Sequence, residues 1–310
     1  MKLFVNILSL DVAAKTYLQS QLLPEIEVFF RNEHSEETQK EAFLKTDLLF
    51  GNPPVAWFEN PPVLRWWQLE SAGFDGYKTL TVNCPITNMG DYFAWPCAET
   101  IVAGILAHYR KIDELAVLQT KKKWVGVPIR FQTGLLRNKK VVVLGAGEIG
   151  KAVKKMLLGF DCDVKLMART APEAVLKSVE DLKATLPHTD LVINCLPGTA
   201  QGFFSAELIN LIKKGGIFAN IGRGNTVDEV ALINALQKGQ LNAAVLDVTA
   251  VEPLPTNSPL WEMKNVILTQ HTGGGQPNED AGKIDWFLAN FNRFQAGQPL
   301  HNQVDLAKGY

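Results

Sequence analysis

Short apolar runs alternate with helical patterns along most of the chain. In the first third, strands are predicted at 3–8, 28–30, 47–50, 63–69 and 80–82, with helices after Asp11 and at 36–44. Farther along, strands are predicted at 141–144, 164–168, 191–196, 216–221, 243–248 and 266–269, with helices at 205–211 and 227–237. Strands that alternate with helices form parallel sheets, so we expect an α/β protein.

The apolar run at 140–144 ends in the pattern GxGxxG, and a helical pattern follows it. Gly145 permits a tight turn, Gly147 lets the backbone approach a pyrophosphate, and Gly150 allows the helix to pack closely on the strand. Strand, glycine turn and helix together predict a dinucleotide site in a doubly wound Rossmann domain; an ordinary glycine-rich turn is the alternative. The expected cofactor-binding residues here are Gly145, Gly147, Glu148, Ile149 and Gly150.

The end of the next strand distinguishes the two nicotinamide cofactors. An acidic residue about twenty positions past the glycine turn would bind the adenosine ribose 2′-hydroxyl of NAD. Here the chain has Ala168, Arg169 and Thr170 instead. A guanidinium suits a 2′-phosphate, so we expect NADP (NADPH), with NAD still possible. The alternative is that Arg169 stacks on adenine or points to water.

A chain of 310 residues is too long for most single cores, so we expect two domains. The helical pattern from Cys97 to Thr120 predicts one long helix that connects them and whose buried face could also serve dimerisation. Three glycines follow His271, and a helix at 278–294 is expected to return to the first domain. The expected domains are 1–96 with 273–310, and 97–272.

Composition excludes several classes of partner. Lys and Arg total 31 against 32 acidic residues, a net charge of −1 that offers no field to attract nucleic acid or an anionic membrane. No apolar stretch is long enough for a bilayer span. The four scattered cysteines suggest neither a disulfide framework nor a zinc site, and we expect no metal. A soluble cytoplasmic protein fits these observations.

Polar residues end three strands of the predicted second sheet, at Arg223, Glu252 and His271. Each alone fits a structural role, as a surface ion pair, a turn residue before proline or a helix cap. Together they suit hydride transfer to a 2-oxo acid. The guanidinium would bind the carboxylate, the imidazolium would donate a proton to the carbonyl oxygen, and the acid would orient and stabilise the protonated ring.

These motifs resemble the D-isomer-specific 2-hydroxyacid dehydrogenase family over nearly the whole chain. The resemblance is carried by residues 71–75, 98–99, 194–199 and 220–232, besides the groups named above. It implies a flavodoxin-like substrate domain, a homodimer, and Arg223, Glu252 and His271 as the catalytic residues. It implies further cofactor contacts at Leu196, Pro197, Thr199, Ile221, Gly222, Arg223, Asp247 (near the carboxamide), His271 and Gly273. The substrate-binding residues that it implies are Ala72, Gly73, Arg223 and His271.

Within the family, residues 168–170 and the tail 304–310 are similar to the glyoxylate/hydroxypyruvate reductase branch, which prefers NADPH. Gln270 departs from the usual proline before the histidine, and the run Gly273–Gly275 is longer in glycine than usual. We expect an NADPH-dependent reductase of small 2-oxo acids such as glyoxylate and hydroxypyruvate. The alternatives are an NAD-dependent D-2-hydroxyacid dehydrogenase acting on a larger substrate, and a nicotinamide-sensing binding protein that resembles the corepressors of this fold.

Overall fold

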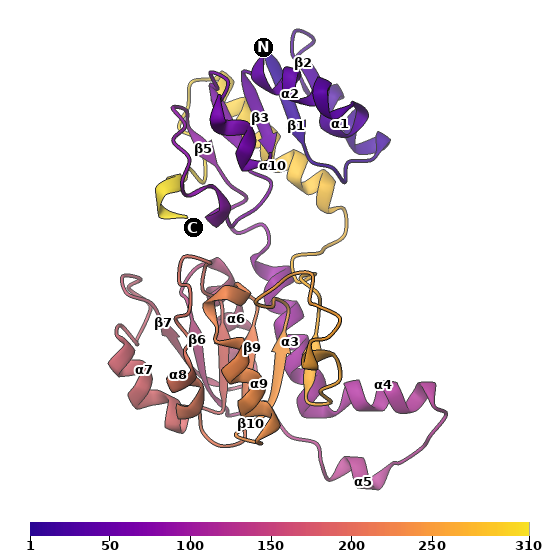
Figure 1. Ribbon diagram of the computed structural model, residues 1–310, viewed down its shortest axis with the longest axis vertical. Coiled ribbons are helices and arrows are strands. Elements are labelled where there is room, and N and C mark those ends of the chain that lie inside the picture. Colours follow the sequence, from indigo (N-terminus) through magenta and orange to yellow (C-terminus); the bar gives the residue numbers. More distant parts are fainter. Residues whose placement is uncertain (310) are drawn as a thin grey trace. The chain divides into compact units, whose positions relative to one another are not determined.

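The computed structural model describes residues 1–309; Tyr310, the last residue of the tail named above, lies outside the described residues. The chain divides into two compact units, residues 1–92 with 276–310 and residues 93–275. These junctions adjoin the expected boundaries at 96/97 and 272/273. Each unit is an α/β sandwich with its own core, which confirms the expected fold class (Figure 1).

The first unit has a five-stranded sheet whose strand order, β2-β1-β3-β4-β5, is that of flavodoxin-like folds. Each neighbouring pair of strands is parallel. Its strands are β1 (Lys2–Asn6), β2 (Glu27–Phe30), β3 (Leu48–Gly51), β4 (Trp66–Gln68) and β5 (Ile86–Thr87), and its helices are α1 (Val12–Gln21), α2 (Glu36–Leu44) and α10 (Glu279–Gln295).

Aromatic side chains fill both faces of this sheet. On the face covered by α1 and α10, the Phe287 ring stacks on Phe50 and on Trp66, with ring centroids 4.5 and 5.0 Å apart. On the other face, Phe43 of α2 packs edge-on against Phe4 and Phe58. The C-terminal segment therefore contributes to the first unit's core.

The predicted strand at 80–82 is wrong. Residues 80–82 form no strand, and the fifth strand is the two-residue β5, which begins directly after Pro85. Leu80 and Val82 alternate with polar residues because they pack, half-buried, against the aromatic cluster, and not because they join the sheet. The strand expected at 63–69 is also shorter, since Val63 is 91% exposed and pairing begins at Trp66.

The second unit has a six-stranded parallel sheet in the order β11-β10-β9-β8-β6-β7, which is the doubly wound arrangement predicted from the sequence (Figure 1). Helices α3 and α6 cover one face, and α7, α8 and α9 cover the other. Its strands are β6 (Lys140–Leu144), β7 (Asp163–Met167), β8 (Leu191–Asn194), β9 (Gly216–Asn220), β10 (Leu241–Leu246) and β11 (Val266–Leu268). Its helices are α3 (Ala94–Arg110), α4 (Ile112–Thr120), α5 (Val127–Arg130), α6 (Glu148–Leu158), α7 (Val179–Thr185), α8 (Ala206–Leu211) and α9 (Glu229–Gln237).

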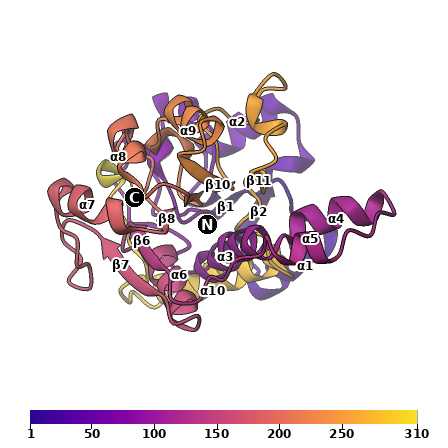
Figure 2. The same ribbon diagram turned by 90° about the horizontal axis from the view of Figure 1, so that it is seen from below.

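The single helix predicted from Cys97 to Thr120 is wrong, because the chain breaks at Lys111 into α3 and α4. Lys111 has a left-handed backbone, φ 58°, and its N–H caps the end of α3. Helix α3 buries one face against the sheet, whereas α4 buries no residue within the chain. Figure 2 shows α4 and α5 projecting away from the sheet of their own unit. Among the described residues, no helix combines the length and the apolar character that crossing a membrane requires.

Candidate active site

The glycine turn between β6 and α6 has the geometry that the sequence predicts. Gly145 has φ +100°, and a Cβ there would lie 2.9 Å from the carbonyl oxygen of Cys195. A Cβ on Gly150 would overlap the carbonyl oxygen of Gly145, so α6 packs tightly against the turn. A Cβ on Gly147 would meet no atom within 4 Å, so the space beside that peptide is open.

Helix α6 begins at this open space, with Gly147 as its N-cap. The first-turn amides of a helix, here including Glu148 and Ile149, lack acceptors within the helix, and the helix dipole favours an anion beside them. The turn lies at the point where the strand order reverses, between β6 and β8, which is where doubly wound sheets bind dinucleotides. The residues present therefore fit a pyrophosphate-containing cofactor.

Arg169 and Thr170 are exposed and follow the end of β7, the strand next to the glycine turn. The backbone here is fixed, because the Ala168 N–H donates to the Leu176 carbonyl. In the part of the chain that the structure describes, Arg169 has no carboxylate within ion-pair distance. A solvated guanidinium at this strand end can bind a phosphate without breaking an existing ion pair.

The other expected cofactor residues follow β8 and β9. Leu196 and Pro197 are partly exposed, and Thr199 is exposed. Ile221 is buried within the core, and its N–H donates to the Asn194 carbonyl at 3.0 Å. Gly222 is buried, and a Cβ on it would lie 2.5 Å from the Leu196 carbonyl oxygen, so the two loops touch.

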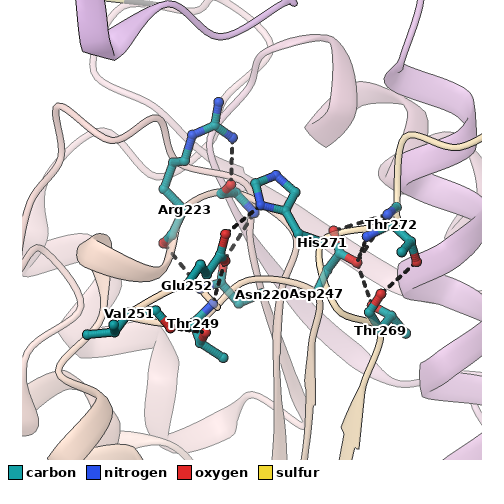
Figure 3. A network of polar contacts seen from close by, with 11 residues as sticks. Asn220, Arg223, Asp247, Thr249, Val251, Glu252, Thr269, His271 and Thr272 are labelled. Atoms are coloured by element: carbon teal, nitrogen blue, oxygen red, sulfur yellow. Dashed lines mark hydrogen bonds and ion pairs between the residues drawn. The ribbon is translucent and has the colours of Figure 1, made fainter. Parts of the chain in front are cut away.

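His271 and Glu252 form a hydrogen-bonded pair at the carboxyl edge of the sheet (Figure 3). The Nδ1 atom of His271 lies 2.6 Å from Oε2 of Glu252. The other oxygen of Glu252 accepts the Thr249 N–H at 2.9 Å, which fixes the carboxylate plane. Because Nδ1 is occupied, Nε2 is the ring atom left for a substrate. The importance of Thr249 was missed from the sequence, where a threonine before Glu252 carries no signal.

The backbone around His271 explains one departure from the family pattern. Gln270 and His271 both have left-handed φ angles, 54° and 55°. Proline, which the family usually has before this histidine, fixes φ near −65° and could not adopt that conformation. The His271 N–H donates to the Asp247 carbonyl at 2.6 Å, which holds the turn in place.

Arg223 follows β9 with an extended backbone, and its guanidinium donates from Nη1 to the Gly222 carbonyl at 2.9 Å. In Figure 3 this guanidinium and the ring of His271 extend to the same side of the loops that carry them. The structure thus brings the predicted guanidinium, imidazole and carboxylate together within the second unit, from three different strand ends.

Asp247, expected beside the nicotinamide carboxamide, is buried and engaged within the chain. Its Oδ1 accepts the Thr269 hydroxyl at 2.6 Å and the amides of Thr272 and Gly273 at 3.1 Å. The Gly273 amide also reaches Oδ2, at 3.2 Å. Asp247 therefore fixes the chain on either side of His271. The N–H of Gly273, a residue expected to contact the cofactor, donates to the Asp247 carboxylate.

A cavity of about 390 Å³ adjoins the pair. Leu254, Trp261 and Leu268 form its apolar side, and Gln270 lines it together with Glu252 and His271. Trp261 was not identified from the sequence, since nothing in the pattern links it to the end of β11. No group of His, Cys, Asp and Glu side chains in residues 1–309 could hold a metal ion.

The expected substrate loop, Ala72 and Gly73, lies in the first unit after β4. Its carbonyl oxygens are held: Asn88 donates from Nδ2 to the Ala72 carbonyl at 2.7 Å, and the Ser71 hydroxyl donates to the Gly73 carbonyl at 2.6 Å. Asn52 in turn donates to the Ser71 hydroxyl at 2.9 Å. Within residues 1–309 the amides of Ala72 and Gly73 have no acceptor, so they can bind an anion.

Comparison with known proteins adds independent information. The family model of the D-isomer specific 2-hydroxyacid dehydrogenase NAD binding domain matches residues 102–273. A glyoxylate/hydroxypyruvate reductase A from Salmonella heidelberg is 32% identical over 218 residues, which cover 68% of each chain. A reductase with the same description from Salmonella newport is similar to the same extent.

Solved structures match the whole chain. A D-isomer specific 2-hydroxyacid dehydrogenase from Xanthobacter autotrophicus, in complex with NADPH and MES, is 27% identical with a TM-score of 0.81, and the match covers 100% of this chain and 99% of that one. An NADPH-dependent glyoxylate/hydroxypyruvate reductase from Sinorhizobium meliloti, in complex with NADP and sulfate, is 23% identical with a TM-score of 0.83 over 100% and 99% of the chains. The second likeness shows the fold alone.

Proposed function

The chain belongs to the D-isomer specific 2-hydroxyacid dehydrogenase family, whose members are NAD(P)-dependent oxidoreductases, and on this premise we propose that it reduces small 2-oxo acids with NADPH. Glyoxylate and hydroxypyruvate are the first substrates to consider, since the relatives described above are named for them. The observation that carries the proposal is the Glu252–His271 pair beside the Arg223 guanidinium, at the sheet edge that also bears the glycine turn.

In the proposed reaction each residue has one task. Arg223 binds the substrate carboxylate through its forked N–H groups and holds the 2-oxo group in place. His271, protonated, donates a proton from Nε2 to the carbonyl oxygen and takes it back in the reverse direction. Glu252 keeps the ring oriented and stabilises its positive charge. NADPH, when bound, supplies the hydride that the carbonyl carbon receives.

The cofactor would be held by the second unit alone. The amides at the start of α6 would bind the pyrophosphate, and Arg169 the 2′-phosphate that distinguishes NADPH from NADH. The Xanthobacter relative, which was crystallised with NADPH, supports this choice. NAD stays a possible second cofactor because Arg169 is exposed and solvated, and so imposes no steric barrier to it. The contacts expected from Leu196, Pro197, Thr199 and Asp247 belong to the same proposal.

In the first unit, the two unpaired amides of Ala72 and Gly73 would offer further hydrogen-bond donors to the carboxylate that Arg223 binds. Support comes from the way Asn52, Ser71 and Asn88 hold the carbonyl side of this loop and leave the N–H side open. Backbone amides without a partner in the chain can donate hydrogen bonds to a carboxylate.

A substrate panel tests the proposed function. Initial rates are measured with NADPH and with NADH, against glyoxylate, hydroxypyruvate and a series of 2-oxo acids with longer side chains. Turnover that is fastest with NADPH and the small acids supports the proposal. Faster turnover with NADH and a larger acid favours the alternative dehydrogenase. Cofactor binding without turnover of any acid favours the nicotinamide-sensing binding protein.

A homodimer is part of the same proposal. We define the arm as residues 112–135, which contains α4 and α5. Its Trp124 is 96% exposed and its Phe131 is 83% exposed. Large apolar side chains gathered on one projecting segment mark an association surface. A second copy of the chain would bury them, consistent with the dimer that the family resemblance implies.

A further inference from the structure

Two asparagines end neighbouring strands in the middle of the second sheet. Asn194 is the last residue of β8 and Asn220 is the last residue of β9, and the two are direct partners in the strand register. Their exposed fractions are 0% and 2%, and that of Thr226, in the 3₁₀ turn after β9, is 0%. Buried polar side chains cost free energy unless they are hydrogen-bonded, so their partners show what they are there to hold.

The three side chains form one hydrogen-bonded network. Asn194 donates from Nδ2 to Oδ1 of Asn220 at 3.0 Å and to the Thr226 hydroxyl at 2.7 Å. The Oδ1 atom of Asn194 accepts the Leu196 N–H at 3.2 Å. The network therefore joins the loop after β8, which is expected to contact the cofactor, to the loop after β9.

In the loop after β9, the network holds the carbonyl of Arg223 and the N–H of Gly222, the residue before it. The Arg223 carbonyl accepts two hydrogen bonds, one from Nδ2 of Asn220 at 3.2 Å and one from the Thr226 hydroxyl at 2.6 Å. On the other side, the Gly222 N–H donates to Oδ1 of Asn220 at 3.0 Å. The Gly222 carbonyl then accepts a hydrogen bond from the Arg223 guanidinium, so the side chain folds back onto the residue whose N–H the network holds.

We propose that Asn194, Asn220 and Thr226 are positioning residues that aim the Arg223 guanidinium at the substrate carboxylate. The proposal rests on the proposed function, because that function assigns the carboxylate to Arg223. Apolar packing could bury the same strand ends without any polar side chain. The Thr226 hydroxyl and the Asn220 amide instead converge on the Arg223 carbonyl, and Asn194 holds both of these side chains. This fixes the origin of a long and otherwise mobile side chain. A misplacement of about 1 Å at such an origin can cost about 10²-fold in rate.

Thr226→Val tests the proposal, since valine keeps the shape of threonine and removes the hydroxyl. The matched control is Thr189→Val. Thr189 is 1% exposed and donates its hydroxyl to the Thr185 carbonyl, but it precedes β8 and so lies at the opposite edge of the sheet. We expect Thr226→Val to lower kcat/KM for glyoxylate about 10- to 100-fold, mainly by raising KM for the acid, with a smaller change in the Kd of NADPH. Thr226→Ser restores the hydroxyl and should restore the rate, and Thr189→Val should behave as the wild type.

A second measurement separates this proposal from the proposed function. Amide hydrogen exchange of residues 221–227 should be faster in Thr226→Val than in the wild type and in Thr189→Val, whether or not the protein reduces any acid. A wild type that turns over no 2-oxo acid contradicts the proposed function. The exchange rates then show by themselves whether the network holds residues 221–227 in place. Exchange in Thr226→Val that equals that of the control, or kinetics of an active enzyme that match the control, overturns the positioning role.

Discussion

His271 presents Nδ1 to Oε2 of Glu252 at 2.6 Å, and this contact leaves only Nε2 of the ring free to exchange a proton with a ligand. The two residues come from different strand ends, nineteen positions apart in the sequence. A carboxylate held by the Thr249 amide on one side and by an imidazole on the other has a fixed plane. The ring orientation is therefore built into the second unit before any substrate binds.

Glu252→Gln should lower kcat for 2-oxo acid reduction by about 10- to 100-fold, because a neutral amide no longer stabilises the protonated ring. The size of the side chain is kept, so the Kd of NADPH should not change. Initial rates and cofactor titration measure the two quantities. Glu229→Gln is the control, since the Glu229 carboxylate also accepts a backbone N–H, that of Ala250, which lies two residues before Glu252 in the same loop. A Glu252→Gln variant that is as active as the wild type and the Glu229→Gln control would exclude Glu252 from the mechanism.

Arg169→Ala should raise KM for NADPH about 10- to 100-fold and leave KM for NADH nearly unchanged, because a charge-assisted contact to the 2′-phosphate is lost only with NADPH. Kinetics with both cofactors at saturating acid provide the comparison. Arg137→Ala removes an arginine that pairs with Asp161, away from the expected phosphate, and serves as control. A loss of similar size with NADH would mean that Arg169 does not read the phosphate.

The stability of the protein should depend on pH through His108. Burial lowers the pKa of this imidazole from 6.5, and the nearby Lys111 lowers it further, while Asp113 opposes the shift. Its Nε2 lies 3.0 Å from the Asn242 amide nitrogen, a donor that requires the neutral ring as acceptor. Because the unfolded chain binds the proton more readily, the contribution of His108 is present above pH 6.5 and is lost as the pH falls through 6.5 toward the folded pKa.

Chemical denaturation between pH 7.5 and 5 measures this effect. The free energy of unfolding should fall with pH by up to about 1.4 kcal/mol per unit more in the wild type than in His108→Gln. His188→Gln, which changes an exposed histidine of the same unit, should retain the wild-type slope. Parallel curves for the wild type and His108→Gln would show that this ring contributes nothing to the pH dependence.

Phe131→Asp in the arm should shift the protein from dimer to monomer, since a buried charge without a partner is costly at an apolar interface. Analytical ultracentrifugation over a range of concentrations measures the mass. Val63→Asp changes an apolar residue of the first unit that is 91% exposed, and it should leave the mass unaltered. A wild type that is monomeric at every concentration, or a Phe131→Asp protein that stays dimeric, would contradict the role of the arm.

The sequence was most informative where one signal dominated. Buried strands such as β6 and β9 are runs of apolar residues, so their existence followed from hydrophobicity alone. Residues that follow parallel strands share one sheet edge, which is why Arg223, Glu252 and His271 could be grouped from the sequence alone. The break between α3 and α4 at Lys111 has no signal in the sequence. Neither glycine nor proline occurs there, and the apolar pattern continues across it.

Other features depend on tertiary contacts that a pattern does not contain. The apolar residues Leu80 and Val82 alternate with polar residues as in a strand, but they do so because they pack on an aromatic cluster. The pairing of Asn194 with Asn220 requires the strand register, although an asparagine that ends a wholly apolar strand is a signal that could have been used. The engagement of Asp247 with the loop after β11 likewise becomes visible only when the two loops are placed together.

The central claim is that His271 is the proton donor. The most direct measurement is kcat of His271→Ala with NADPH and glyoxylate, together with the Kd of NADPH from nicotinamide fluorescence. We predict that kcat falls by about two to four orders of magnitude while the cofactor still binds. Turnover at the wild-type rate by this variant would contradict the account.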